Sequence, residues 1–171
     1  STILDGNGAG FSDLRNLTAD AEGNLYFAEE GGQKIWRWNS SANTLTTLVT
    51  GVHECLGLAV DFEGNVYYAS NESGVQNRVR KWSAGTGEVT LLFQGTGGMV
   101  QSVAVDHLGT VYYTTNFPRG AYYWDVEPNQ FVQIAPDLNS DSTFGLENPH
   151  GIAVDGSGRA FIADISRFKL F

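Results

Sequence analysis

Five residues of different chemistry stand just before apolar runs that recur along this chain: Arg15, Glu54, Leu56, Gln101 and His150. A guanidinium, an imidazole and amide groups can together hold the carboxylate of a small acid or of a peptide end. We therefore predict a binding site that contains Arg15, Glu54, Gln101 and His150. The alternative is that these side chains only form hydrogen bonds with one another and with water.

An acidic stretch near the C-terminal end offers a second kind of chemistry. Asp137, Asn139 and Asp141 place oxygen atoms at alternate positions, and a loop that wraps calcium supplies its ligands in this way. The pattern departs from a calcium loop at Ser142, where glycine is usual, and at Asn148, where glutamate is usual. We expect no cofactor, with calcium in this stretch as the alternative to a solvated polar loop.

Three sequences of the form Asn-x-Ser/Thr could accept glycans if the protein is exported: they begin at Asn16, Asn39 and Asn71. We expect the last two to lie in loops. The single cysteine, Cys55, excludes a disulfide within the given sequence, and we expect a buried, unreactive thiol. These features, with a surface poor in lysine, favour an extracellular location.

A repeat spaces the candidate residues along the chain. An apolar run, an Asp-x-x-Gly turn and a second apolar run occur four times, and the aspartates stand 41, 45 and 49 residues apart. In such a turn the aspartate accepts amide hydrogens and the glycine supplies a positive φ. Strand-rich repeats of this length are typical of propeller blades. The anchors are Asp20, Asp61, Asp106 and Asp155, followed by Gly23, Gly64, Gly109 and Gly158.

Each repeat reads as four short strands, and no stretch has the periodicity of an amphipathic helix. Aromatic residues recur at two positions, in the second and third strands, and we expect both columns to be buried between neighbouring blades. Burying one such side chain contributes roughly 1.5–3 kcal/mol. The two columns are Tyr26, Tyr67, Tyr112 and Phe161, and Trp38, Trp82, Trp124 and Phe171.

The repeats predict an all-β fold, a β-propeller with four blades of four antiparallel strands. The expected blade units are about 14–50, 55–95, 100–136 and 149–171, within a single domain that covers 1–171. The run 1–5 resembles a fourth strand, so we expect it to complete the last blade and to close the ring. The alternative is a fragment of a six-bladed propeller.

The charge balance excludes some partners. With 10 Lys and Arg against 19 Asp and Glu, the formal net charge is −9, which repels phosphate backbones and anionic lipids. We therefore expect no nucleic-acid partner. We also expect no membrane insertion, because no apolar run reaches the length of a transmembrane segment.

The segment Pro149-His150-Gly151-Ile152-Ala153-Val154-Asp155, with Ala163-Asp164 at its end, resembles the NHL repeat, and so does Gln76-Asn77-Arg78-Val79. The resemblance covers nearly the whole chain and implies a propeller related to gluconolactonase-like and amidating-lyase enzymes. Those lyases bind zinc through histidines from several blades. Arg15, Leu56 and Gln101 take that place in the other three repeats here, so the resemblance does not extend to a zinc site.

The sequence thus favours a non-catalytic extracellular propeller that binds a protein or a small ligand, or that assembles into a homo-oligomer or polymer. It contains neither a G-x-S-x-G nucleophile elbow nor a phosphate-binding G-x-x-x-x-G-K loop. The alternative is an enzyme of the lactonase or lyase type, or a piece of one, with its site around His150, Arg15 and Gln101.

Overall fold

The structure is a computed structural model that describes residues 10–72, 75–94, 98–125, 130–135, 145–166 and 169–170. In these residues every regular element is a β-strand, which confirms the all-β expectation. No helix in this part of the chain has the length and apolar character needed to cross a membrane.

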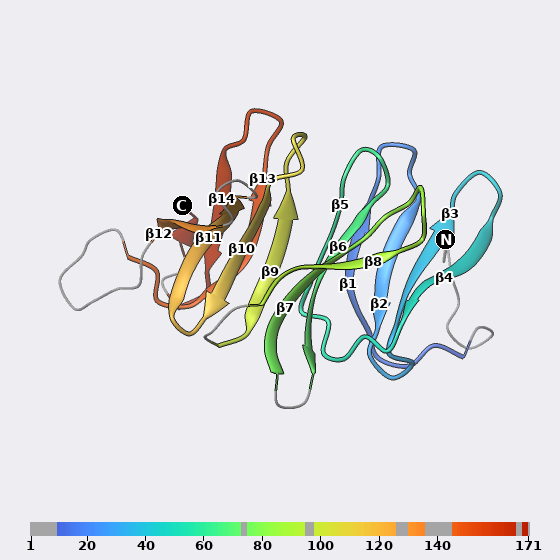
Figure 1. Cartoon of the computed structure of the whole chain (residues 1–171), viewed down its shortest axis with the longest axis horizontal. Helices are drawn as coiled ribbons and strands as arrows, with labels where there is room; N and C mark the ends of the chain where they lie inside the picture. Colours follow the sequence, from blue (N-terminus) through green and yellow to red (C-terminus); the bar gives the residue numbers. More distant parts are fainter. Residues whose placement is uncertain are drawn as a thin grey trace.

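Each repeat forms one antiparallel sheet in which consecutive strands are neighbours (Figure 1). The first sheet contains β1 (Leu14–Ala19), β2 (Leu25–Glu29), β3 (Lys34–Asn39) and β4 (Thr44–Thr50). The second contains β5 (Gly57–Val60), β6 (Val66–Glu72), β7 (Val75–Trp82) and β8 (Val89–Gln94). The third contains β9 (Val100–Val105), β10 (Val111–Asn116), β11 (Arg119–Asp125) and β12 (Gln130–Ala135). The fourth contains β13 (Pro149–Val154), β14 (Ala160–Asp164) and β15 (Lys169–Leu170).

The four sheets follow one another in an open row. Their first strands contact each other in chain order, β1 with β5, β5 with β9 and β9 with β13, and the first and last sheets lie at opposite ends of the molecule (Figure 1). The predicted closed ring is therefore not confirmed, because the described sheets do not close. The run 1–5, expected to complete the last blade, lies outside the described residues, as does Phe171.

The hairpin between the first two strands of each sheet has the predicted turn chemistry. In the first sheet, Oδ1 of Asp20 accepts a hydrogen bond from the backbone N–H of Asn24 at 2.8 Å, and Gly23 has φ of +79°. Partial burial alone would raise the pKa of Asp20, but hydrogen bonds from Asn24 and Tyr26 outweigh it and lower the pKa. The carboxylates of Asp61, Asp106 and Asp155 accept the equivalent backbone hydrogen bond.

The second-strand tyrosines connect these turns to one another. Tyr67 donates a hydrogen bond from its hydroxyl to Oδ2 of Asp61 at 3.1 Å. The same hydroxyl lies 3.8 Å from the place where a Cβ on Gly109, in the turn of the next sheet, would stand. The pairs Tyr26–Asp20 and Tyr112–Asp106 repeat the bond.

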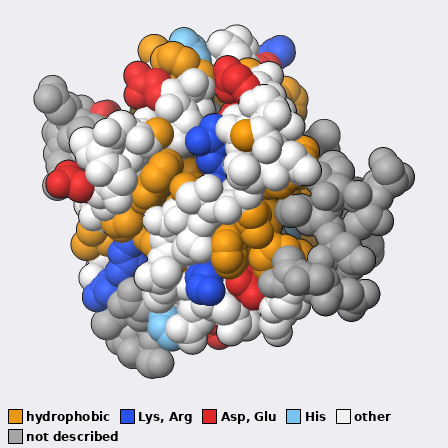
Figure 2. All heavy atoms as spheres, turned by 90° about the vertical axis from the view of Figure 1, so that its right-hand side faces the viewer, with side chains coloured by type: hydrophobic (Ala, Val, Ile, Leu, Met, Phe, Trp, Pro, Cys, Tyr) orange, Lys and Arg blue, Asp and Glu red, His pale blue; other side chains and the backbone are white. Residues whose placement is uncertain are grey.

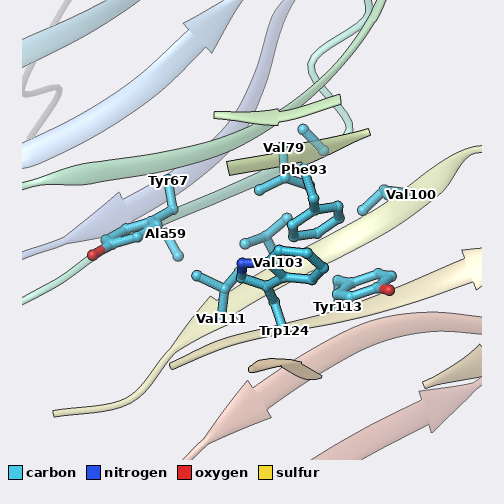
Figure 3. Close-up of a cluster of buried hydrophobic side chains, with 10 residues drawn as sticks. Ala59, Tyr67, Val79, Phe93, Val100, Val103, Val111, Tyr113 and Trp124 are labelled. Atoms are coloured by element: carbon cyan, nitrogen blue, oxygen red, sulfur yellow. The ribbon is translucent and has the colours of Figure 1, made fainter. Parts of the chain in front are cut away.

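Three apolar clusters fill the spaces between neighbouring sheets. Figure 3 shows the middle one, where Ala59, Tyr67 and Val79 of the second sheet meet Val111 and Trp124 of the third. We use "front face" for the face of a sheet that carries the Tyr67-type residue and packs on the following sheet. The opposite face, which packs on the preceding sheet, is the "rear face". Most of the two aromatic columns is therefore core between sheets. The exceptions are Trp38, which is half-buried on the rear face of the first sheet, and Phe161, which is 39 % exposed; Phe171 lies outside the described residues.

In the first and fourth sheets the last residue of the second strand, Glu29 or Asp164, anchors a nearby loop or strand. Glu29 accepts hydrogen bonds from the N–H of Ser12 and from Nε1 of Trp36. Asp164 accepts backbone hydrogen bonds at the loop before β13 and at Ser166. These buried carboxylates therefore stabilise the fold.

Candidate functional site

The first strands of the sheets surround a pocket of about 460 Å³. Arg15, Gln101 and His150, which the sequence analysis selected, are brought together here, and Leu56 joins them. The complete lining is Arg15, Asn16, Leu56, Gln101, Ser102, His150 and Gly151. All four sheets thus contribute to one site.

The strands β1, β9 and β13 each contain a β-bulge, and these bulges position polar side chains in the wall of the pocket. The pairing between β9 and β10 skips Gln101, and the pairing between β13 and β14 skips His150. In the first sheet the skipped residue is Asn16, which has φ of +45°. A β-bulge leaves one residue out of the ladder and turns its side chain in a new direction. The bulges therefore release these residues from strand pairing at the point where the strands meet.

Direct contacts between the first strands give the pocket a firm base. Nδ2 of Asn16 donates to the carbonyl oxygen of Cys55 at 2.6 Å, which links the first sheet to the second. The N–H of Ile152 donates to Oγ of Ser102 at 3.4 Å, which links the fourth sheet to the third. Gly57 of β5 lies so close to β9, the first strand of the next sheet, that a Cβ on Gly57 would stand 2.7 Å from the backbone nitrogen of Val103.

Arg15 is the cation of the pocket, and Asp13 orients it. Oδ1 of Asp13 accepts a hydrogen bond from Nε of Arg15 at 3.2 Å, and Oδ2 accepts one from Nη2 at 3.1 Å. This pairing raises the pKa of Arg15 above its usual value, and Glu30 and Glu54 add to the effect. Both side chains of the pair are about half exposed, at 48 % and 51 %. A ligand therefore meets an oriented guanidinium at the solvent boundary.

Glu54 does not line the pocket. It is exposed, its backbone N–H donates to Oε1 of Glu30 at 2.8 Å, and its Oε2 accepts a hydrogen bond from Nδ2 of Asn71 at 3.4 Å. The segment that leads into β5 thus contributes Leu56 to the site, whereas the side chain of Glu54 is bound by Asn71 of β6.

Cys55 is buried, as expected, and burial is the main reason that its pKa rises to about 12, with a smaller contribution from Glu30. Its sulfur lies 3.5 Å from the carbonyl oxygen of Gly57. A thiol with such a pKa is protonated at neutral pH and is a poor nucleophile.

The structure also bears on the metal and glycan candidates. The proposed calcium ligands Asp137, Asn139 and Asp141 lie outside the described residues, and the described residues contain no group of three His, Cys, Asp or Glu side chains placed to hold a metal. The expectation that Asn39 and Asn71 lie in loops is wrong: Asn39 ends β3 and Asn71 belongs to β6.

The pocket also contains residues that the sequence analysis missed as ligands: Asn16, Ser102 and Gly151. The sequence marks Asn16 only as a glycan acceptor. The four aspartate anchors would have placed Ser102 and Gly151 next to Gln101 and His150, but nothing in the residue types marked the bulges.

No family model matches the sequence, and no curated protein matches it significantly. Among solved structures, the chain is similar to a chain of the nidogen/laminin complex, with 24 % identity, a TM-score of 0.66, and coverage of 84 % of this chain and 54 % of that one. It is also similar to a streptogramin B lyase, with 17 % identity, a TM-score of 0.67, and coverage of 92 % and 50 %. A third similar structure is TolB from Acinetobacter baumannii, with 10 % identity, a TM-score of 0.69, and coverage of 92 % and 42 %.

These likenesses concern the fold alone. The chain spans about half the length of the solved structures that it matches, 54 % of the nidogen/laminin chain and 54 % of virginiamycin B lyase from Staphylococcus aureus. The neighbours are β-propellers, and the sheets of this chain have the same arrangement. The fold is a β-propeller.

Proposed function

We propose that the chain is a non-catalytic, extracellular propeller module of the NHL-repeat type that binds a small polar ligand and assembles with a protein partner. The ligand is the carboxylate of a small acid or of a peptide end. The observation that carries the ligand proposal is the pocket in which Arg15, Gln101 and His150 meet.

The arrangement suits a carboxylate. Asp13 occupies the Nε and Nη2 edge of the Arg15 guanidinium, so a ligand carboxylate would approach the edge formed by the two Nη atoms. The side chains of Gln101 and His150 stand on neighbouring strands and can each donate one further hydrogen bond. Leu56 supplies an apolar wall for the remainder of the ligand.

The acidic groups and the thiol support a role without catalysis. The aspartates of the hairpins accept backbone hydrogen bonds, and Glu29 and Asp164 anchor other segments. Cys55 is buried with a raised pKa. These carboxylates and this thiol are thus engaged in holding the fold.

The open row of sheets supports a ring larger than four blades, completed by components beyond these sheets. A fragment of a six-bladed propeller is the alternative within this proposal. The proposed extracellular location rests on the three Asn-x-Ser/Thr sequences and on the surface poor in lysine.

An enzyme of the lyase type is the second candidate, and one observation favours it. His150 opens on the pocket of a fold that is similar to a catalytically inactive histidine-to-alanine variant of virginiamycin B lyase, solved with quinupristin. The likeness is 14 % identity with a TM-score of 0.66, so it supports the fold and leaves the chemistry to experiment.

Calorimetric titration with citrate, glutamate and short peptides tests the proposal. We expect one of these carboxylates to bind the wild-type protein, and Arg15→Ala and His150→Ala to weaken that binding by about tenfold each. Arg119→Ala is the matched control, because Arg119 is an exposed arginine at the start of β11 and does not line the pocket.

Two results would overturn the proposal. The ligand function fails if none of these probes binds, or if binding is equal in the wild type and the Arg15→Ala and His150→Ala variants. The non-catalytic function fails if the protein opens quinupristin or a simple lactone at a rate that His150→Ala abolishes.

A further inference from the structure

Among the sheets that the structure describes, none packs on the rear face of the first sheet. Leu17 lies on this face opposite Phe27 and is 67 % exposed. The equivalent residues of the other sheets are Leu58, Val103 and Ile152, which are 9 %, 4 % and 9 % exposed because each packs on the preceding sheet. Leu17 therefore occupies a position that is buried wherever a preceding sheet exists.

The rear face is apolar beyond Leu17. Leu14, on the same strand, is 51 % exposed, and Trp36 is half-buried beside Phe27. Phe11 packs edge-on against both rings at centroid distances of 5.5 and 5.6 Å. Figure 2 views the end of the molecule that carries the first sheet and shows hydrophobic side chains gathered in several patches across it.

The last sheet has an uncovered front face, the counterpart of the uncovered rear face of the first sheet. Phe161 is 39 % exposed, whereas Tyr26 and Tyr67 at the equivalent position are 1 % and 3 % exposed. Ala163 is exposed, whereas the equivalent Ala28 and Ala69 are buried. The front face of the last sheet thus presents the aromatic and alanine surface that the first two sheets bury against a following sheet.

We propose that a second copy of this chain covers both uncovered faces, with the rear face of the first sheet of one copy packed on the front face of the last sheet of the other. This inference rests on the assembly part of the proposed function and is independent of the ligand pocket. Each junction would continue the type of interface that already joins the four sheets. At each junction, as between the sheets within one chain, large apolar side chains of a rear face would pack against the aromatic and alanine side chains of a front face.

The hydrogen bonds of the hairpin turn in the last sheet are compatible with a front face that is exposed in the monomer and covered in the dimer. In the first three repeats a tyrosine hydroxyl bonds the turn aspartate, but Phe161 has no hydroxyl. Asp155 is instead bound by Ser157 and by Arg159 at 2.7 Å each. The carboxylate of Asp155 therefore keeps these hydrogen bonds within its own turn, whether or not another sheet covers the front face.

The geometry also fits a closed pair. The chain spans 50–54 % of the nidogen/laminin, streptogramin B lyase and virginiamycin B lyase chains, so two copies together have about the length of one of those chains. Two head-to-tail junctions related by a twofold axis close a ring and leave no free face.

The test is native mass spectrometry together with sedimentation of the wild-type chain over about a hundredfold range of concentration. We expect the mass of two chains, with monomer appearing on dilution. Leu17→Lys and Phe161→Glu are each expected to weaken the dimer at least about tenfold. Leu108→Lys is the matched control, because Leu108 is 78 % exposed in a hairpin turn and lies on neither face. Circular dichroism checks that each variant is folded.

Mixing the two variants gives the sharpest result. A mixed dimer has one unchanged junction and one junction where the introduced lysine faces the introduced glutamate, so dimer is expected to return. Monomer at every wild-type concentration overturns the inference, and so does dissociation by Leu17→Lys with no effect of Phe161→Glu, which would indicate two rear faces in contact. Carboxylate binding by a strictly monomeric protein would contradict the assembly while supporting the pocket.

Discussion

Tyr67 and Asp61, six residues apart, are joined by a hydrogen bond of 3.1 Å from the tyrosine hydroxyl to the carboxylate. Asp61 also accepts the backbone N–H of Asn65 at 2.8 Å, so one carboxylate holds the hairpin turn and the ring of the second strand. Because the hydroxyl reaches the turn of the next sheet at Gly109, this pair sets the position of one blade against another.

We expect Tyr67→Phe to lower the free energy of unfolding by about 1.5 kcal/mol, the usual loss when a hydrogen bond to a charged group is removed. Tyr123→Phe is the control: Tyr123 is a half-buried tyrosine of the third sheet whose ring lies 5.8 Å from that of Tyr112. Urea unfolding followed by tryptophan fluorescence measures both. Equal losses in the two variants would show that the bond to Asp61 has no special weight.

Gly57→Ala is expected to destabilise the protein by about 1–3 kcal/mol, because the added methyl group would press on the backbone of Val103 in the next sheet. Gly85→Ala is the matched control. It lies in a turn with nothing within 4 Å of its Cβ position, so its effect is expected between zero and a gain of about 1 kcal/mol. Thermal melting compares the two variants, and a stable Gly57→Ala protein would contradict the close approach of β5 and β9.

The repeat could be predicted from sequence because its signals are local. The turn at Asp61 and Gly64 needs an acceptor and a positive φ, and few residue types supply either. The aspartates also gave the register of each sheet, and that register placed Arg15, Gln101 and His150 at one mouth of the fold. Spacing alone was sufficient for these features.

Other features depend on contacts that no local pattern encodes. The bulges at Asn16 and His150 arise from the way the first strands converge, and the residues themselves are ordinary for a strand end. Glu29 accepts a hydrogen bond from Nε1 of Trp36, and Lys34 lies over the Trp36 ring at 5.1 Å, although opposite charges five residues apart could equally have formed an ion pair. The open row depends on the angle between sheets, which the repeat length does not specify.

Cys55 is expected to react at least about a hundredfold more slowly with a thiol reagent at pH 8 in the folded protein than in urea. The thiol is buried, and its pKa of about 12 leaves little thiolate at that pH. A colorimetric disulfide reagent gives both rates. A folded rate close to the unfolded rate would mean that the Cys55 thiol is accessible.

The stability of the protein is expected to fall between about pH 10 and pH 12. Burial, with the hydrogen bond to Asp20, raises the pKa of Tyr26 from its ordinary value near 10 to about 12. A raised pKa contributes stability that is complete below the unfolded-state value and is lost as the pH rises through the folded-state value. Tyrosinate absorbance followed together with circular dichroism measures the loss, and Tyr26→Phe is expected to reduce it.

The bulges separate the pocket residues from the strand pairing that builds the blades. Gln101 and His150 have no opposite partner in their ladders, so a change of side chain there alters neither strand register nor the apolar clusters. A library that varies these two positions together with Arg15 would explore new specificities on an unaltered scaffold. The mouth of this propeller is thereby a natural starting point for engineering receptors.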